Sequence, residues 1–220
     1  MIGPFFAVTA AVLFGLSSPL AKVLIGSIDP WLLAGILYLG SGVGMAFIQL
    51  IRTFGSQKPT QIKIATKELP WLAGVIFFGG ISGPVLLMYG LSYTTASTAS
   101  LLLNLEGVFT AGLAWIVFKE HYDRRIVLGM LAIILGGIVL SWVPGITLKS
   151  LIGPLLVGAA CFSWGVDNNL TRKISLNDPI LITMIKCLGA GTTNLIIALS
   201  FGARLPNLML LSEAVVLGFV

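Results

Sequence analysis

The longest stretch without a charged side chain, residues 69–105, limits the folds open to this chain more than any other feature of its sequence. A helix needs about 20 apolar residues to cross the hydrocarbon core of a bilayer, so this stretch is too long for one crossing. Its small and polar segment GLSYTTASTAS, at residues 90–100, favours a break there. The stretch therefore predicts two membrane-spanning helices, at residues 70–91 and 97–118.

The composition is that of a chain that lies in a membrane. Hydrophobic residues make up 57% of the 220 residues and charged residues 10%, whereas soluble domains have about 45–50% and about 25%. So few charges cannot cover a water-soluble globule of this size, which excludes a soluble enzyme, a disordered chain and a nucleic-acid binder. With one histidine in the chain, we expect no metal site and no cofactor. The sequence predicts an all-α polytopic membrane protein surrounded by the lipid bilayer.

Apolar runs predict seven complete spans and the beginning of an eighth. The runs lack the alternating pattern of barrel strands, which favours helices. The final run, of about 11 residues, is too short to cross a bilayer, so we expect the sequence to stop within the eighth helix. The predicted spans are residues 2–21, 30–51, 70–91, 97–118, 126–142, 151–170 and 179–201, with the eighth beginning at residue 210.

The net charge of +5 is explained better by an orientation in the membrane than by an anionic partner. Of the 13 Lys and Arg residues, nine fall in the loops after the second, fourth and sixth predicted spans, and three fall on the opposite side. Because cytoplasmic loops carry an excess of positive charge, we expect a cytoplasmic N-terminus in the plasma membrane, here the bacterial inner membrane. The nine residues are Arg52, Lys58, Lys63, Lys67, Lys119, Arg124, Arg125, Arg172 and Lys173.

The sequence resembles itself at an offset of about 150 residues. The first unit, residues 1–145, holds five predicted spans, so a second copy that begins at residue 151 must enter the membrane from the opposite side. Such inverted repeats are common in secondary transporters. We therefore expect a ten-helix (5+5) inverted-repeat fold whose second unit, residues 151–220, is incomplete. The matched pairs are Gly3-Pro4 with Gly153-Pro154, Asp29-Pro30 with Asp178-Pro179, and Gly40 and Gly42 with Gly189 and Gly191.

The fourth predicted span resembles the signature helix of the EamA-type transporters of the drug/metabolite transporter superfamily. The similar segment is SLLLNLEGVFTAGLAWIVFKE, residues 100–120, and Gly107 stands where the usual family pattern has proline. The segment SWGVDNNLTRKIS, residues 163–175, and the stretch around Lys186 resemble one bacterial subgroup of that family. The resemblance implies ten spans in two five-helix units that export or import small metabolites.

Glu106 is the first candidate functional residue, because it lies near the middle of a predicted span. A carboxylate deep in a membrane is costly and marks a candidate functional site. It could bind substrate or exchange a proton. Alternatively, a protonated Glu106 only forms a hydrogen bond between helices, and Asn104 and Asn194 are the expected partners.

Lys186 and Asp167 are expected to form a pair. They lie about 10 Å and about 7 Å from the same membrane face at 1.5 Å per residue, on consecutive antiparallel spans. A buried pair costs far less than two separate buried charges. The pair is either a static link or a switchable one that alternates with substrate. Trp164, one turn from Asp167, either lines the same pocket or contacts lipid.

A glycine-rich segment in the third predicted span also has two interpretations. Gly79, Gly80, Gly83 and Pro84 could break the helix and expose carbonyl groups to a cavity, or they could produce a simple kink. Tyr38 is interpreted as an interfacial or lipid-facing aromatic residue.

Together these features predict a secondary transporter that moves a small metabolite or drug-like solute by alternating access and is coupled to protons or another ion. The three intramembrane charges sum to −1, which favours a cationic, zwitterionic or proton-coupled substrate over a dianion. The sequence allows a homodimer. We find no nucleophile–base set, so we do not expect an enzyme. A non-transporting or lipid-moving accessory membrane protein remains the alternative.

Overall fold

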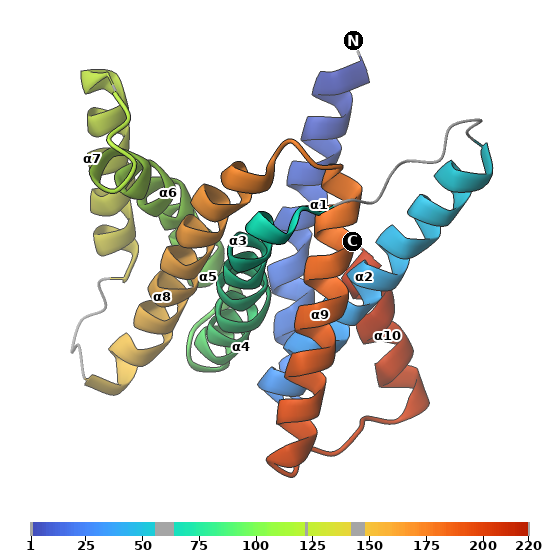
Figure 1. The fold of residues 1–220 in the computed structure, drawn as a ribbon. Helices are drawn as coiled ribbons and strands as arrows, with labels where there is room; N and C mark the ends of the chain where they lie inside the picture. The colour runs from blue at the N-terminus through green and yellow to red at the C-terminus, as the bar shows by residue number, and fades with distance from the viewer. Residues whose placement is uncertain (1, 56–63, 122, 142–147, 220) are drawn as a thin grey trace.

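The computed structural model describes residues 2–55, 64–121, 123–141 and 148–219, and every regular element in these ranges is a helix (Figure 1). The predicted loop residues Lys58 and Lys63 and the last residues of the fifth and eighth predicted spans, 142 and 220, lie outside these ranges. The α-helices are α1 (Ile2–Ile25), α2 (Pro30–Gly55), α3 (Leu69–Gly74), α4 (Gly83–Tyr93), α5 (Ala96–Leu102), α6 (Leu105–Ile116), α7 (Arg124–Ser141), α8 (Leu148–Thr171), α9 (Pro179–Ser200) and α10 (Leu208–Phe219). Three short elements join them: η1 (Thr66–Glu68) and η3 (Arg172–Ile174) are 3₁₀-helices, and η2 (Val75–Ser82) is a π-helix.

Six helical stretches of the described residues are long and apolar enough to cross a membrane. They support the prediction of an all-helical polytopic membrane protein. The final helix α10 is apolar but shorter. The stretches are Val8–Ile25, Pro30–Phe54, Thr66–Tyr93, Ala96–Ile116, Ser150–Ile174 and Pro179–Ser200.

The break predicted within residues 90–100 is confirmed. Helix α4 ends at Tyr93, and Thr95 caps the start of α5 by accepting a hydrogen bond from the backbone N–H of Thr98 at 3.1 Å. Threonine is a good helix N-cap because its hydroxyl replaces a missing backbone acceptor.

The span predicted over residues 97–118 corresponds to one apolar stretch, Ala96–Ile116. Within it the helix is interrupted between α5 and α6, where Asn104 Nδ2 donates a hydrogen bond to the carbonyl of Leu101 at 2.9 Å. An asparagine side chain competes with the backbone for such carbonyl groups and so disturbs a helix from within. The interruption lies just before Glu106 and needs no proline at position 107.

Two Asp-Pro pairs of the sequence repeat begin α2 and α9. Asp29 Oδ1 accepts a hydrogen bond from Trp31 N at 2.9 Å, and Asp178 Oδ1 accepts one from Ile180 N at 2.9 Å. Proline fits the first turn of a helix because its missing N–H is not needed there. Asp178 also forms an ion pair with Arg52 at the end of α2, at 3.0 Å. Burial opposes ionisation of Asp178, but the bonds from Arg52 and Ile180 outweigh it and lower the pKa of the carboxyl group.

The helices pack around α2, α8 and α9. Helix α2 contacts α9 and α10, while α8 contacts η2, α4 and α6. Helix α7 lies at one edge of the molecule, beside α6 (Figure 1). The side chains of Leu32, Leu33, Leu91 and Val157 are fully buried in the largest core cluster. Many large apolar side chains elsewhere are exposed, as expected of helices that face lipid.

Close backbone packing joins α2 to α9. A Cβ atom at Gly191 of α9 would lie 2.6 Å from Leu39 N and 3.0 Å from Gly35 O, both in the α2 backbone. Two helix backbones approach this closely only where small residues face each other. Glycine is therefore required at position 191 to hold the two helices in contact.

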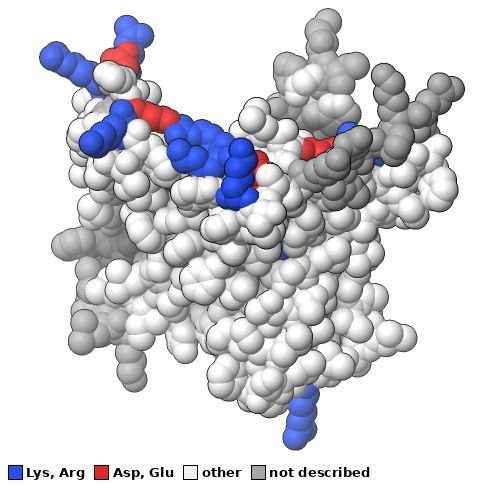
Figure 2. Space-filling model, in the orientation of Figure 1, with Lys and Arg blue, Asp and Glu red and all other residues white. Residues whose placement is uncertain are grey.

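Charged side chains gather at one end of the bundle. Figure 2 shows most Lys and Arg side chains at the end where Figure 1 marks the N-terminus. At this end Arg172, after α8, forms an ion pair with Glu120, after α6. The white surface between the two ends carries few charges (Figure 2), as expected of a part that lies in the hydrocarbon core.

Candidate functional site

The glycine-rich segment forms the π-helix η2, which leaves backbone carbonyl groups available. The N–H of Gly83 bonds to Phe78 O, five residues back, instead of to Gly79 O. Pro84 has no N–H and so cannot donate to Gly79 O at π spacing or to Gly80 O at α spacing. Short π segments occur often at functional sites.

Side chains from three other helices bind these carbonyl groups. Tyr38 Oη of α2 and Trp164 Nε1 of α8 donate to Gly79 O at 2.6 Å and 3.1 Å. Asn194 Nδ2 of α9 donates to Gly80 O at 3.0 Å. Neither of the two sequence interpretations describes this segment fully: the helical stretch continues from Thr66 to Tyr93 through the π segment, and protein side chains occupy the available carbonyl groups.

Two predictions about aromatic and amide residues need correction here. Tyr38 does not face lipid: it lies at the centre of the bundle, on the same helix face as the small residues that pack against α9. Asn194 is fully buried, but its Oδ1 accepts from Trp31 Nε1 at 3.1 Å, so its partners are Gly80 and Trp31 and not Glu106.

The predicted pair of Lys186 and Asp167 forms beside this segment. Lys186 Nζ lies 2.8 Å from Asp167 Oδ2, and Thr171 Oγ1 donates to Asp167 Oδ1 at 3.1 Å. The side chains of Lys186 and Asp167 are 20% and 5% exposed. A Cβ atom at Gly79 would overlap the Asp167 carboxylate. The glycine in η2 therefore makes room for the carboxylate that pairs with Lys186.

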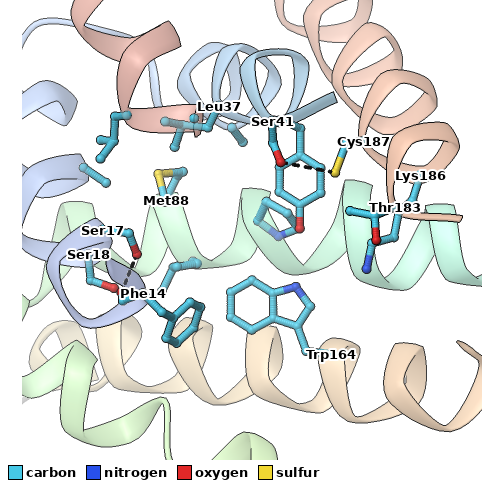
Figure 3. Close-up of a pocket in the computed structure, with 17 residues that line it drawn as sticks. Phe14, Ser17, Ser18, Leu37, Ser41, Met88, Trp164, Thr183, Lys186 and Cys187 are labelled. Atoms are coloured by element: carbon cyan, nitrogen blue, oxygen red, sulfur yellow. Dashed lines mark hydrogen bonds between the residues drawn. The ribbon is translucent and has the colours of Figure 1, made fainter. Parts of the chain in front are cut away.

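A cavity of about 320 Å³ lies next to the pair. Figure 3 shows Lys186 and Thr183 at one end of this cavity, Phe14 and Ser18 toward the other, and Trp164 between them. Asp167 bonds to Lys186 but is not itself part of the cavity wall. The wall consists of Phe14, Ser17, Ser18 and Ala21 from α1; Ala34, Leu37, Tyr38 and Ser41 from α2; Pro84, Leu87 and Met88 from α4; Trp164 from α8; Thr183, Lys186 and Cys187 from α9; and Leu217 and Gly218 from α10.

Glu106 lies elsewhere, on the face where α6 meets α8. Its Oε1 accepts from Asn168 Nδ2 at 2.9 Å, and Asn168 also bonds to Thr110 Oγ1 at 3.1 Å. The prediction that Asn104 or Asn194 would be the partner of Glu106 is therefore wrong. Glu106 does not belong to the cavity wall. Asn104 lines a second, smaller hollow of about 180 Å³, whose wall includes Phe14 and Ser18 of the main cavity.

The six candidate residues thus divide into separate groups. Asp167, Lys186, Trp164 and Asn194 surround the π segment and the main cavity, whereas Glu106 and Asn104 lie toward α5 and α6. The sequence analysis missed Tyr38, Thr183 and Asn168. A signal for Tyr38 was present, because it lies three residues after Gly35 and four before Gly42, on one helix face with these small residues.

Asn194→Ala should destabilise the fold by about 1–3 kcal/mol, because it leaves the Gly80 carbonyl and the Trp31 N–H without partners in the protein interior. Asn104→Ala is the matched control: Asn104 is exposed, its side chain bonds within its own turn, and its loss should have little effect. Thermal unfolding of the purified variants in detergent compares the two. If Asn194→Ala destabilises the protein no more than Asn104→Ala does, the Asn194 bonds add no stability.

These observations define a class: an all-helical membrane protein with a cavity between its helices that has an ion pair at one end. Comparison with known proteins narrows the class to a family. The profile of the EamA-like transporter family matches residues 1–142, so this chain belongs to that family.

Curated relatives carry transporter names. The chain is 29% identical to an uncharacterized transporter of Methanothermobacter thermautotrophicus, over 92% of this chain and 63% of the relative. It is 26% identical to the uncharacterized transporter YyaM of Bacillus subtilis, over 88% of the chain and 63% of the relative. It is 28% identical to a probable amino-acid metabolite efflux pump of Salmonella typhimurium, over 80% and 55%. The chain thus spans less than two thirds of the length of these relatives.

A solved crystal structure has the same fold. It superimposes with a TM-score of 0.65 and covers 96% of this chain and 74% of the solved chain, at 16% sequence identity. At this identity the similarity concerns the fold alone. With the family match and the apolar helices, it makes the chain an integral membrane protein of a transporter family.

Proposed function

We propose that this protein is a secondary transporter that moves a small metabolite or drug-like solute across the bacterial inner membrane by alternating access. The observation that carries the proposal is the cavity beside the Lys186–Asp167 pair. Its wall combines α1, α2 and α4 of the first sequence unit with α8, α9 and α10 of the second. A site lined by helices of both units changes shape when some of these helices move relative to the others, as alternating access requires.

Contacts between the helices support a two-unit architecture. The repeat makes α1 equivalent to α8 and α2 equivalent to α9. In a ten-helix inverted repeat, the contact of α8 with α4 then corresponds to the contact of α1 with α10, and both are present. Because the repeat exchanges α2 and α9, the contact between these two helices corresponds to itself. The concentration of Lys and Arg near the N-terminus supports a cytoplasmic N-terminus.

Glu106 is the proposed coupling residue. Lys186 and Asp167 neutralise each other, whereas Glu106 has the Asn168 amide as its hydrogen-bond partner. A carboxylate within a membrane-spanning segment is costly and marks a candidate functional site, and on that ground we assign the coupled proton to Glu106. The neutral hydrogen bond from Asn168 fits either protonation state after rotation of the amide.

Glu106→Gln should abolish coupled transport while the protein still inserts and folds, because glutamine keeps the hydrogen-bonding shape but cannot titrate. The matched control is Glu120→Gln, the same chemical change at an exposed position after α6, which should leave flux unchanged. Flux is measured in vesicles with and without a pH gradient. Normal, gradient-dependent flux in the Glu106 variant would remove this residue from the mechanism.

The transport function itself is tested by metabolite profiling. The protein, expressed from its complete gene, is compared with an Asp167→Asn/Lys186→Gln double variant, and both medium and cytosol are profiled without preselected compounds. We expect at least one compound to change its distribution with the active form alone. If both forms insert equally well and no compound moves, a non-transporting or lipid-moving accessory role replaces the proposal.

A further inference from the structure

The formal charge in the wall of the main cavity lies at one end. Of the described residues that form it, Lys186 alone carries a formal charge, and its ammonium lies at one end (Figure 3). Resting on the proposed transport function, we infer that the cavity binds an amphipathic monocarboxylate, with its carboxylate at Lys186 and its apolar body toward Phe14 and Met88.

The ammonium of Lys186 has hydrogen atoms to spare for a ligand. A lysine ammonium donates three hydrogen bonds, and in this structure one is directed to Asp167 Oδ2 at 2.8 Å. The Thr183 side chain extends into the same end of the cavity, one helical turn before Lys186 (Figure 3). An ammonium beside a hydroxyl group matches the two oxygens of a carboxylate.

Asp167 does not offer an equivalent site for an amine. Its Oδ2 accepts from Lys186 and its Oδ1 from Thr171, and its side chain is 5% exposed. A ligand ammonium would have to displace Lys186 and leave that charge without its partner in the protein interior, which is costly. The second membrane-span carboxylate, Glu106, is not part of the wall.

The other end of the cavity fits an apolar group. Phe14, Leu37 and Met88 line it beside Ser17 and Ser18, and the ring of Trp164 lies between that end and Lys186 (Figure 3). The Ser17 hydroxyl there donates to the Phe14 carbonyl at 2.6 Å. A second carboxylate on the ligand would therefore meet apolar side chains, which favours one carboxylate on an apolar body. The volume of about 320 Å³ is within the range of small-molecule sites.

Three probes with the same phenylethyl skeleton test this assignment. They are 3-phenylpropanoate, which has only the carboxylate; L-phenylalanine, which has carboxylate and ammonium; and 2-phenylethylamine, which has only the ammonium. Each is titrated into the purified protein made from its complete gene, and the unfolding temperature is measured, since a ligand of the folded state raises it. We expect a saturable rise with a carboxylate probe and none with the amine. A rise with 3-phenylpropanoate assigns the carboxylate as the sufficient group, whereas a rise with L-phenylalanine alone would show that the ligand ammonium is required and would overturn the assignment.

A double variant tests whether Lys186 is the anchor. Asp167→Asn/Lys186→Gln keeps a neutral hydrogen-bonded pair and should weaken binding of the carboxylate probe at least 10-fold. Lys173→Gln, at a lysine that lies over the Phe118 ring outside the cavity, is the matched control and should bind normally. A shift with the amine equal to that with the carboxylates, or full carboxylate binding by the double variant, would overturn the assignment.

The outcomes for ligand class and for transport are separable. If metabolites are displaced in the profiling experiment but no carboxylate probe shifts the unfolding temperature, the ligand class is wrong and transport stands. If a carboxylate probe binds at Lys186 but no compound is ever displaced, the site exists and transport is wrong.

Discussion

Lys186→Ala alone should lower the stability and the yield of the folded protein more than Lys186→Ala combined with Asp167→Ala. The single change leaves the Asp167 carboxylate, with its side chain 5% exposed, without a cation. Removing one member of a buried pair costs about 3–5 kcal/mol, whereas removing both members is often close to neutral. Thermal unfolding and the yield of monodisperse protein in detergent measure the difference.

The ion pair between Arg172 and Glu120 provides the control for this cycle. Its side chains are 46% and 44% exposed, and exposed pairs contribute about 0–1 kcal/mol. Arg172→Ala should therefore change stability little, alone or with Glu120→Ala. If the double variant at Lys186 and Asp167 is less stable than either single variant, the pair does more than neutralise two buried charges.

Gly191→Ala should destabilise the protein at or beyond the upper end of the about 1–3 kcal/mol that is typical of overpacking. The new Cβ would lie 2.6 Å from Leu39 N. Backbone atoms of α2 cannot rotate away as a flexible side chain can, so α2 and α9 must separate along their contact. Unfolding temperature and expression level measure the loss.

Gly189→Ala is the matched control, because it makes the same change two residues earlier on α9. Its Cβ would meet Ile76 Cδ1 at 3.6 Å, an ordinary van der Waals distance, and alanine favours a helix more than glycine does. We expect this variant to be neutral or slightly stabilised. Equal damage from both substitutions would mean that general glycine flexibility, and not the α2–α9 contact, is what matters.

Sequence alone predicted the features that depend on local pattern. The apolar runs gave the helices, because a membrane requires long helices whose backbone groups bond internally. The break near Thr95 and the Asp-Pro helix starts follow from local capping. The pairing of Lys186 with Asp167 could be predicted because two consecutive antiparallel helices place equal depths side by side.

The features that sequence alone did not predict depend on contacts between distant segments. Tyr38 bonds to Gly79 only because α2 packs beside the π segment, and no local pattern encodes that neighbour. Glu106 bonds to Asn168 and not to the predicted amides because α6 packs against α8, a contact that no local pattern encodes. Candidate residues could be selected by type, but their partners required the fold.

The hydrogen bonds at η2 also constrain how parts of this protein can move. Tyr38 belongs to the first sequence unit, whereas Trp164 and Asn194 belong to the second, yet all three hold the same two carbonyl groups. The close α2–α9 contact joins the same two units. If each unit moved as one rigid body, the bonds from Trp164 and Asn194 to these carbonyl groups would break and the glycine contact would open at the same time. The mechanical boundary of the molecule therefore differs from the boundary of its sequence repeat: η2, α2, α8 and α9 form a common frame, and relative motion is cheapest for the helices that pack around it.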